Sequence, residues 1–214
     1  MSTEAGSPLK LIRWRPKKTF NGTKYDFSID KKETRGPLMK EECKSLITLY
    51  TPSLKDLGFR QKMMADEETM SYNHAWGGTI PFPKETWHGW YDFWIVEHEN
   101  KRYYRYLKDS GGHFIGEVAY HFDSDKNIYL ADVIVYAPYR KMGYGSIGLN
   151  LLCNAAKQNG IKQLYDDIAI DNPSVTMFFK NGFVEEYRTS EIVMLKKELS
   201  ASTLHSGCEV GNVN

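Results

Sequence analysis

The stretch VIVYAPYRKMGYGSIG, residues 133–148, decides how the rest of the chain is interpreted. It carries an apolar run, then the pattern G-x-G-x-x-G at Gly143, Gly145 and Gly148, and it leads into a helical pattern. Asp166 follows about twenty residues later, at the spacing at which a dinucleotide-binding unit places its ribose carboxylate. The stretch therefore raises two alternatives, a nicotinamide or flavin dinucleotide site or a site for another phosphate ligand.

The surrounding pattern argues against a dinucleotide fold. Three β-prone segments precede the glycines, at residues 102–108, 113–122 and 127–136, and the turns GGH and DSDKN between them predict antiparallel pairing. A dinucleotide-binding sheet needs several parallel strands joined by helices, and only residues 149–214 follow the motif. A dinucleotide-dependent oxidoreductase is therefore the weakest of the functions that we consider.

The glycine turn itself predicts a cradle for an anion. Glycine allows dihedral angles and a close backbone approach that other residues resist. Where a helix begins, successive N–H groups point at one spot and can hold a phosphate. Arg140 or Lys141 can add a charge-assisted contact. A tight strand-to-helix turn without a ligand would explain GYG alone, so the phosphate site needs support from elsewhere in the chain.

A second motif supplies that support. DNPSVTMFFKNGF, residues 171–183, follows one strand after the glycine turn. With both motifs in place, the chain resembles the GCN5-related N-acetyltransferase (GNAT) superfamily. The resemblance covers about residues 100–197 well and the first hundred residues only by the order of elements. The pyrophosphate pattern Q/R-x-x-G-x-G/A is matched by Arg140, Gly143 and Gly145, and the second motif of the superfamily resembles Asn172, Ser174, Phe178 and Gly182-Phe183.

The resemblance implies an α/β (α+β) fold, in which a mixed, mostly antiparallel sheet of about six to seven strands is splayed around acetyl-CoA and flanked by helices. The splayed strands would be those at 127–136 and 162–170. We expect a single domain at 9–199, with an acceptor-side half at 9–99 and an acetyl-CoA-binding core at 100–199. Residues 1–8 and 200–214 are small and polar, and we expect flexible tails there.

The other elements are predicted from hydrophobic periodicity and from Gly and Pro breaks. Strands are expected at 10–16, 162–170 and 183–199, with a hairpin turn at Asn21-Gly22. Helices are expected at 36–50, 53–64, 87–95, 147–156 (ending near Asn159-Gly160) and 172–182, and residues 72–83 are expected to form a loop.

By the same resemblance, acetyl-CoA is the implied acetyl donor, as co-substrate, and no metal is expected. Main-chain groups near the end of the first splayed strand would pair with its pantetheine, and the amide near Val135 would polarise the thioester carbonyl as an oxyanion hole does. Amides of the glycine turn would hold the pyrophosphate, and the second motif would lie along the CoA arm. The residues implied are Val133, Ile134, Val135, Arg140, Lys141, Met142, Gly143, Tyr144, Gly145, Ser146, Asn172, Phe178 and Phe179.

The acceptor is then expected to be a primary amine, which must lose a proton before it attacks. An unperturbed lysine-like amine has a pKa of about 10.4, so neutralising it at pH 7 costs roughly 4.6 kcal/mol. A carboxylate or a water relay would remove the proton, and the carboxylate candidates are Asp132, Asp166, Asp167 and Glu117. Asp166 and Asp167 lie on opposite faces of their strand. We favour Asp167 and Asp132 equally, with His121 as a weaker candidate base.

The thiolate leaving group raises a further question. Many members of the superfamily carry a tyrosine, as thiolate acid, where this chain has Phe178. Tyr139 or Tyr144 could supply the proton instead, or CoA could leave as the thiolate, and we take Tyr139 as the candidate. Without such an acid, a CoA-binding regulatory domain that has lost turnover stays an alternative to an enzyme.

The resemblance places the acceptor pocket among the early helices and the last two strands. His74 and Trp76, in the expected loop, and Trp94 are the substrate-binding candidates, because aromatic rings can stack on a ligand or hold a cation. Trp87, Trp90 and Trp94 follow helical spacing, which more often means core packing. Acidic residues near the expected cleft suit a cationic acceptor, and we favour a small-molecule amine over a protein amine.

Composition sets outer limits on function. The chain has 214 residues, a net charge of +1, 41% hydrophobic residues and three cysteines. This charge gives no electrostatic case for binding nucleic acid or an anionic membrane, and the cysteines form no disulfide or metal framework. The sequence contains no run of about eighteen apolar residues, so we expect no membrane-spanning helix. We therefore expect a cytoplasmic enzyme, and a homodimer is compatible with the sequence.

Overall fold

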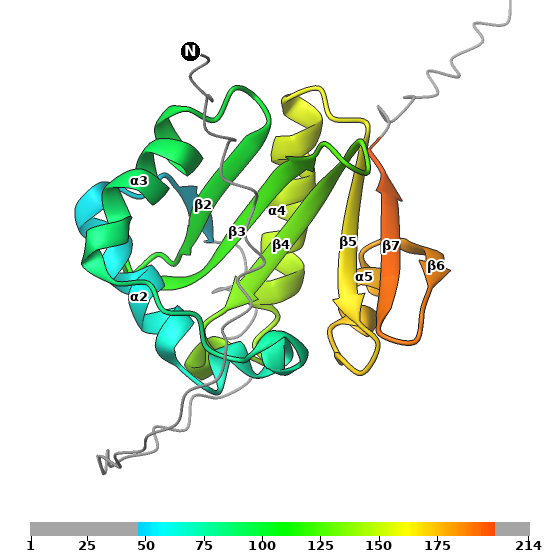
Figure 1. Cartoon of the computed structure of the whole chain (residues 1–214), viewed down its shortest axis with the longest axis horizontal. Coiled ribbons are helices and arrows are strands. Elements are labelled where there is room, and N and C mark those ends of the chain that lie inside the picture. The colour runs from blue at the N-terminus through cyan, green and yellow to red at the C-terminus, as the bar shows by residue number, and fades with distance from the viewer. Residues whose placement is uncertain (1–46, 200–214) are drawn as a thin grey trace, which may run out of the picture.

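The computed structural model describes residues 47–199, apart from the side chains of Ala75 and Trp76. Its centre is one sheet of seven strands in the order β1-β2-β3-β4-β5-β7-β6 (Figure 1). Every neighbouring pair is antiparallel except β4 with β5, which confirms the expected mixed, mostly antiparallel sheet. The strands are β1 (Thr48–Tyr50), β2 (Arg102–Lys108), β3 (Phe114–Asp123), β4 (Ile128–Val135), β5 (Gln163–Ala169), β6 (Val184–Arg188) and β7 (Ile192–Glu198).

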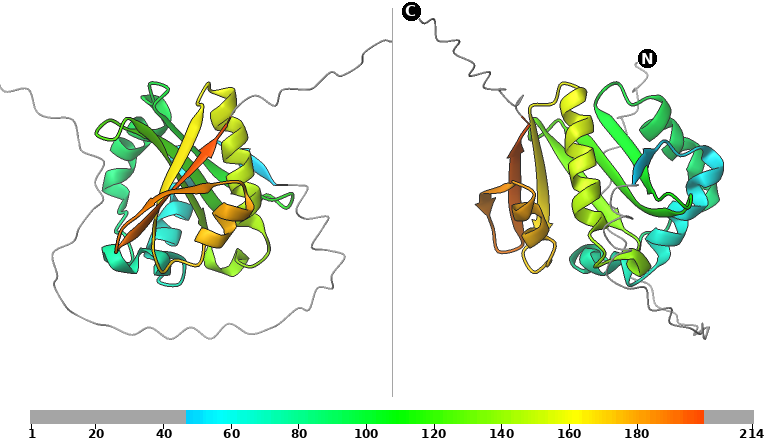
Figure 2. Two further views of the ribbon diagram at one scale, coloured as in Figure 1. Left: turned by 90° about the vertical axis from the view of Figure 1, so that its right-hand side faces the viewer. Right: turned by 180° about the vertical axis from the view of Figure 1, so that it is seen from behind.

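Helices cover both faces of this sheet. Seen from behind, α4 and α5 lie on one face (Figure 2, right), whereas α2 and α3 lie over the β1–β2 end of the other face (Figure 1). The α-helices are α2 (Leu57–Ala65), α3 (Trp87–Tyr91), α4 (Tyr144–Gln158) and α5 (Val175–Lys180). Short 3₁₀ helices are η1 (Leu54–Asp56), η2 (Thr69–Trp76), η3 (Lys84–Thr86) and η5 (Ala137–Tyr139), and η4 (Asp92–Val96) is a π-helical turn.

Strand alternation divides the side chains of β3 and β4 between the two faces. Val118 of β3 pairs with Val133 of β4, and both pack in the large core under α4; we call this side the α4 face. Glu117 and Ala119 of β3 point to the opposite side, the α2 face. There Ala119, Tyr104 and Tyr106 form a second core, against which Phe59, Trp90 and Trp94 pack.

The two parallel strands diverge. A single residue pair, Leu130 with Tyr165, joins β4 to β5, and Figure 1 shows the strands separating toward their C-terminal ends. β5 then pairs along its whole length with β7. The splay expected between residues 127–136 and 162–170 is therefore present.

The helix predicted at 87–95, which carries Trp87, Trp90 and Trp94, packs as its spacing predicts. Trp90 contacts Tyr104 edge to face with the ring centroids 4.7 Å apart, and Trp94 stacks beside Trp90 at 6.0 Å. The predicted helix at 87–95 is thus confirmed as the α3–η4 segment, with Trp90 and Trp94 facing the sheet. None of the helices between residues 47 and 199 is long and apolar enough to cross a bilayer.

Two predicted elements need correction. The helix expected at 36–50 is wrong at its end, because Thr48–Tyr50 pairs with Tyr106–Lys108 as an edge strand, where aromatic and β-branched side chains fit well. The loop expected at 72–83 begins inside η2, which ends at Gly77 in a left-handed conformation. The strand at 10–16, the turn at Asn21-Gly22 and the tails lie outside the described residues. The helices and strands predicted after residue 100 are confirmed.

Candidate active site

The turn between β4 and α4 has two left-handed residues. Gly143 is the N-cap of α4 with φ 86°, a conformation that side chains rarely adopt. Lys141 has φ 63°, one of the few positive values at a non-glycine residue in the described part of the chain. Left-handed residues in such a turn direct successive amides to one side, which forms a concavity suited to an anion. Lys141, Met142 and Gly143 are exposed there.

The other two glycines of the motif serve packing. A Cβ atom on Gly145 would lie 2.7 Å from Sδ of Met177 in α5, and one on Gly148 would lie 2.7 Å from Cδ1 of Leu107 in β2. Gly145 therefore lets α5 approach α4, and Gly148 lets α4 approach the sheet. The pattern G-x-G-x-x-G combines one conformational requirement with two close contacts, which explains it without a dinucleotide.

Main-chain groups of β4 point into the splay. The amide of Tyr136 donates to the carbonyl of Ile115 in the β3 direction, and amides alternate sides along a strand. The amides of Val133 and Val135 are therefore directed toward β5, where the β4–β5 ladder has ended. The amide of Ile134, one of the residues predicted to bind cofactor, is directed toward β3 instead.

Arg140 binds main-chain carbonyls of the neighbouring segments. Its guanidinium donates to the carbonyls of Glu68 (2.8 Å), Thr69 and Val135 (3.2 Å). These contacts tie η2 to the glycine turn, and the amide of Ala137 adds a bond to the Thr69 hydroxyl at 3.0 Å. The side chain of Arg140 thus fixes the shape of the turn, which leaves Lys141 as the exposed cation there.

Asp132 and Asp167 lie across the splay from each other. Each is two residues beyond the single β4–β5 pair, Leu130 with Tyr165, and on the same face as that pair, the α2 face. The side chain of Asp132 is 54% exposed, with Oδ2 3.7 Å from Nδ1 of His121. The side chain of Asp167 is 17% exposed, with Oδ2 3.5 Å from Nζ of Lys126. Asp166 falls on the α4 face.

Glu117 is not available as a base. It is buried and accepts hydrogen bonds from Arg60 of α2 and from the hydroxyl of Tyr104. Burial, and next the charge of Glu117, raise the pKa of Tyr104, so this phenol stays protonated. Burial alone would lower the pKa of Arg60, but the charge of Glu117 raises it above its ordinary value. The guanidinium also lies 4.8 Å from the Trp90 ring centroid.

Acceptor-side residues partly follow the prediction. Trp94 lies edge-on to His121 at 6.1 Å, and Nε2 of His74 is 3.1 Å from Oδ2 of Asp171, just after β5. The Trp76 side chain lies outside the described part. Tyr72 of η2 was missed by the sequence interpretation, although burial and then the charges of Asp132 and Glu117 raise its pKa. No local pattern marks it, because these partners are distant in sequence.

The second motif orders the turn before a helix and packs the core. Oδ1 of Asn172 accepts from the amide and the hydroxyl of Ser174, at 2.9 and 2.7 Å, which fixes the turn that leads into α5. Phe178 is 3% exposed and packs on Phe183, so its ring belongs to the core and a ligand cannot lie along it. Phe179 is 43% exposed and remains accessible.

The two tyrosines proposed as alternative acids both lie beside the glycine turn. Tyr144 is buried. The Tyr139 ring lies between those of Tyr136 and Tyr144, with centroids 6.2 and 6.5 Å away. Asn181, which was not predicted, donates to the hydroxyl of Ser146 at 3.1 Å and so links α5 to α4.

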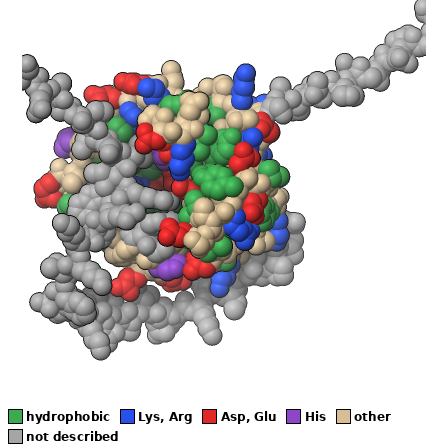
Figure 3. Space-filling model, turned by 45° about the vertical axis from the view of Figure 1, so that its right-hand side comes forward, with side chains coloured by type: hydrophobic (Ala, Val, Ile, Leu, Met, Phe, Trp, Pro, Cys, Tyr) green, Lys and Arg blue, Asp and Glu red, His purple; other side chains and the backbone are tan. Residues whose placement is uncertain are grey.

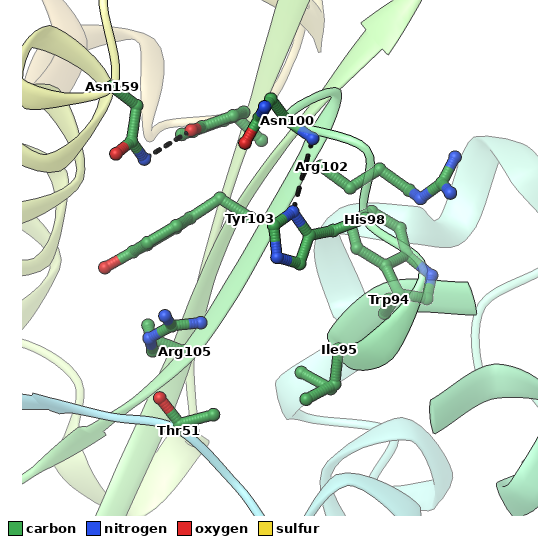
Figure 4. Close-up of a pocket in the computed structure, with 10 residues that line it drawn as sticks. Thr51, Trp94, Ile95, His98, Asn100, Arg102, Tyr103, Arg105 and Asn159 are labelled. Atoms are coloured by element: carbon green, nitrogen blue, oxygen red, sulfur yellow. Dashed lines mark hydrogen bonds between the residues drawn. The ribbon is translucent and has the colours of Figure 1, made fainter. Parts of the chain in front are cut away.

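A separate hollow of ≈ 190 Å³ lies at the edge of β2 (Figure 4). Tyr103, Arg105 and Tyr120 line it from the α4 face, and Trp94 and His98 border it from the other side. It is therefore distinct from the splay. On the face shown in Figure 3, acidic and basic side chains are interspersed over the described surface. The described residues contain no group of three or more His, Cys, Asp or Glu placed to hold a metal ion.

Comparison with solved structures shows the same fold in acetyltransferases. Spermidine N-acetyltransferase from Vibrio cholerae, in complex with CoA and spermine, aligns with a TM-score of 0.59 and 19% identity over 72% of this chain and 96% of that one. Phosphinothricin acetyltransferase from Sinorhizobium meliloti, in complex with AcCoA, aligns at 0.58 and 15%, over 72% and 88%. An N-acetyltransferase from Staphylococcus aureus Mu50 aligns at 0.58 and 16%, over 72% and 99%.

Comparison with curated proteins gave no match. A family model described as "Acetyltransferase (GNAT) family" matches residues 62–183, more than half of the chain. This span begins within α2 and contains the splayed strands, the glycine turn and the second motif. The chain therefore belongs to the acetyltransferase (GNAT) family.

Proposed function

We propose that the protein transfers the acetyl group of acetyl-CoA to the primary amine of a small molecule. The observation that carries the proposal is the splay, in which β4 and β5 share one residue pair and then part beside a left-handed turn. A thioester carrier needs both features, a gap that admits its pantetheine arm and a concavity that holds its phosphates. The family match supports the same reaction.

The chain's own groups fit such a ligand. The amides of Val133 and Val135 are directed into the gap, so they can pair with pantetheine or polarise the thioester carbonyl. The amides from Lys141 to Ser146, at the start of α4, suit the pyrophosphate, and the helix dipole adds about 0.3–1 kcal/mol per charge. Lys141 can add a charge-assisted contact, while Asn172 lies between β5 and α5, and Phe179 lies within α5.

Proton removal needs a base beside the splay. The ammonium form of the amine has no lone pair and cannot attack, so a base must take its proton. Asp132 and Asp167 are the candidates, since both lie on the α2 face beside the end of the β4–β5 ladder. Departure of CoA as a thiol needs a proton at sulfur, for which Tyr139 remains our candidate.

The acceptor is proposed to lie on the α2 face. Trp94 and His74, with Trp76 in the same segment as His74, would border it. The carboxylates of Asp132 and Asp167, both beside the end of the β4–β5 ladder, favour a cationic acceptor over a neutral one. The structural neighbours include enzymes named for spermidine and phosphinothricin, both small molecules with amino groups. A cytoplasmic location and a homodimer remain predictions from the sequence.

Turnover and binding measurements test this function together. Thermal unfolding would be followed with acetyl-CoA, CoA and NAD, and CoA release would be followed with spermidine, phosphinothricin and a set of monoamines. We expect stabilisation by acetyl-CoA and CoA but not by NAD, and release of CoA with at least one amine. Binding of CoA without turnover of any amine would favour a regulatory domain. Stabilisation by NAD alone would contradict the proposal.

A further inference from the structure

His121 lies beside the apex of the splay, one strand away from it. It lies in β3 directly opposite Leu130 of β4, and Leu130 forms the last pair between β4 and β5. Its side chain shares the α2 face with Asp132, which lies diagonally across on β4. A thioester that enters between the two strands has to stop at this apex, so His121 and Asp132 both border the place where the reacting carbon would lie.

One nitrogen of the His121 ring lacks a partner. Nδ1 is buried and has no hydrogen bond to any described residue, which is costly for a polar atom. The nearest carboxylate oxygen, Oδ2 of Asp132, is 3.7 Å away. That distance is longer than a hydrogen bond, but catalytic hydrogen bonds often tighten only when substrate is bound. The ring is 14% exposed, and Trp94 lies edge-on to it from η4.

The other charged groups around His121 are already paired. Arg102, directly opposite in β2, donates to the carbonyls of Phe93 and Glu97 at 2.8 and 2.6 Å. Asp123, two residues along β3 on the same face, lies 3.9 Å from Nζ of Lys126. Asp132 is therefore the one carboxylate near the ring that has no cationic side chain recorded beside it among the described residues.

We infer that His121 accepts the proton of the acceptor amine, with Asp132 as the positioning residue that holds Nδ1–H. This rests on the proposed function. Nε2 takes a proton from the ammonium, and the nitrogen lone pair forms the new C–N bond at the thioester carbonyl carbon. The C–S bond breaks, and its electron pair leaves with sulfur. The nitrogen then loses its second proton, so the products are the amide, CoA as a thiol and one proton released to solvent.

Chemical rescue tests the role of His121. His121→Ala and His121→Gln would be compared with His113→Ala as the control, because His113 forms a similar pair with Asp109 at 3.1 Å on the exposed β2–β3 turn. We expect kcat to fall about 100-fold or more in both His121 variants, with an unchanged Kd for CoA. Added imidazole should restore part of kcat in His121→Ala. His113→Ala should stay within about twofold of wild type, because it lies outside the site.

The pH profile separates a proton-transfer role from a structural one. In wild type, kcat/KM should rise with pH as the base loses its proton. This rise should be lost in His121→Gln, which keeps the shape of the side chain but cannot take the proton. Turnover that is retained in His121→Gln with the same profile would overturn the inference and leave the proposed function intact. Wild type that binds CoA but acetylates no amine would overturn both.

Discussion

Gly145 of α4 faces Met177 of α5 so closely that a Cβ atom on the glycine would lie 2.7 Å from the methionine sulfur. Gly145→Ala should therefore displace Met177 and destabilise the protein by about 1–3 kcal/mol. Urea unfolding would measure the loss. In the double variant with Met177→Ala, the steric conflict disappears, so the combined loss should be smaller than the sum by about 1 kcal/mol. Additive losses would show that Met177 is not the obstacle.

A substitution at Gly143 leads to a different prediction, because this position needs glycine for its left-handed backbone conformation. Gly143→Ala would hold an alanine at φ 86° and should cost about 1–3 kcal/mol. Gly160→Ala is the matched control, since Gly160 has φ 81° with open space around it at the other end of α4. Both variants should lose similar stability, but only Gly143→Ala should weaken CoA binding in calorimetry. Equal CoA affinity in the two variants would argue against phosphates at this turn.

Sequence reasoning succeeded where neighbouring residues carry the signal. The strands from Arg102 onward and the α5 motif follow from alternation, turns and two short patterns, the splay was implied by the family resemblance, and the family match agrees with them. Sequence reasoning was wrong where contacts with residues distant in the chain determine the structure of a segment. Thr48–Tyr50 is a strand because β2 offers an edge. Arg140 binds carbonyls of η2, about seventy residues earlier in the chain, which no local pattern indicates.

The same limit applies to the candidate site. Asp132 and Asp167 could be named from their strands, but their common face follows only from the register at Leu130 and Tyr165. Glu117 was also among the carboxylate candidates, but it is buried and paired with Arg60, 57 positions away in sequence. Spacing reveals which residue types are present in each element, whereas burial and pairing depend on how the elements meet.

The buried pair of Arg60 and Glu117 should matter to stability more than to chemistry. Glu117→Gln leaves the guanidinium buried without its counter-charge, and such a loss typically costs about 3–5 kcal/mol. A double variant, Arg60→Met with Glu117→Leu, removes both charges and should recover most of this loss. Urea unfolding at pH 7 would compare the two. A double variant as unstable as Glu117→Gln would show that the charge pair itself stabilises the fold.

Asp56 gives a pH dependence whose sign can be worked out. Burial alone would raise the pKa of its carboxyl, but hydrogen bonds from Ser53 and Tyr50 outweigh burial and leave it below the ordinary value. A depressed pKa in the folded state stabilises the protein above the unfolded pKa of about 3.9, and this contribution disappears as pH falls through the folded value. Asp56→Asn should therefore lower the free energy of unfolding at pH 7, with the difference shrinking toward pH 3. A difference that stays constant with pH would contradict this account.

The two carboxylates across the splay make the last prediction, which concerns the chemical step. Asp132→Asn should lower kcat about 10- to 100-fold, because the amide cannot hold an imidazolium as a carboxylate does. Asp167→Asn should have a smaller effect, since Lys126 already lies 3.5 Å from that carboxylate. Asp166→Asn is the control on the α4 face, and CoA affinity should be unchanged in all three variants. A large loss of kcat in Asp167→Asn beside normal turnover in Asp132→Asn would place the base on β5 instead of at His121 of β3, and the acceptor amine with it, because a proton can be taken only across hydrogen-bond distance.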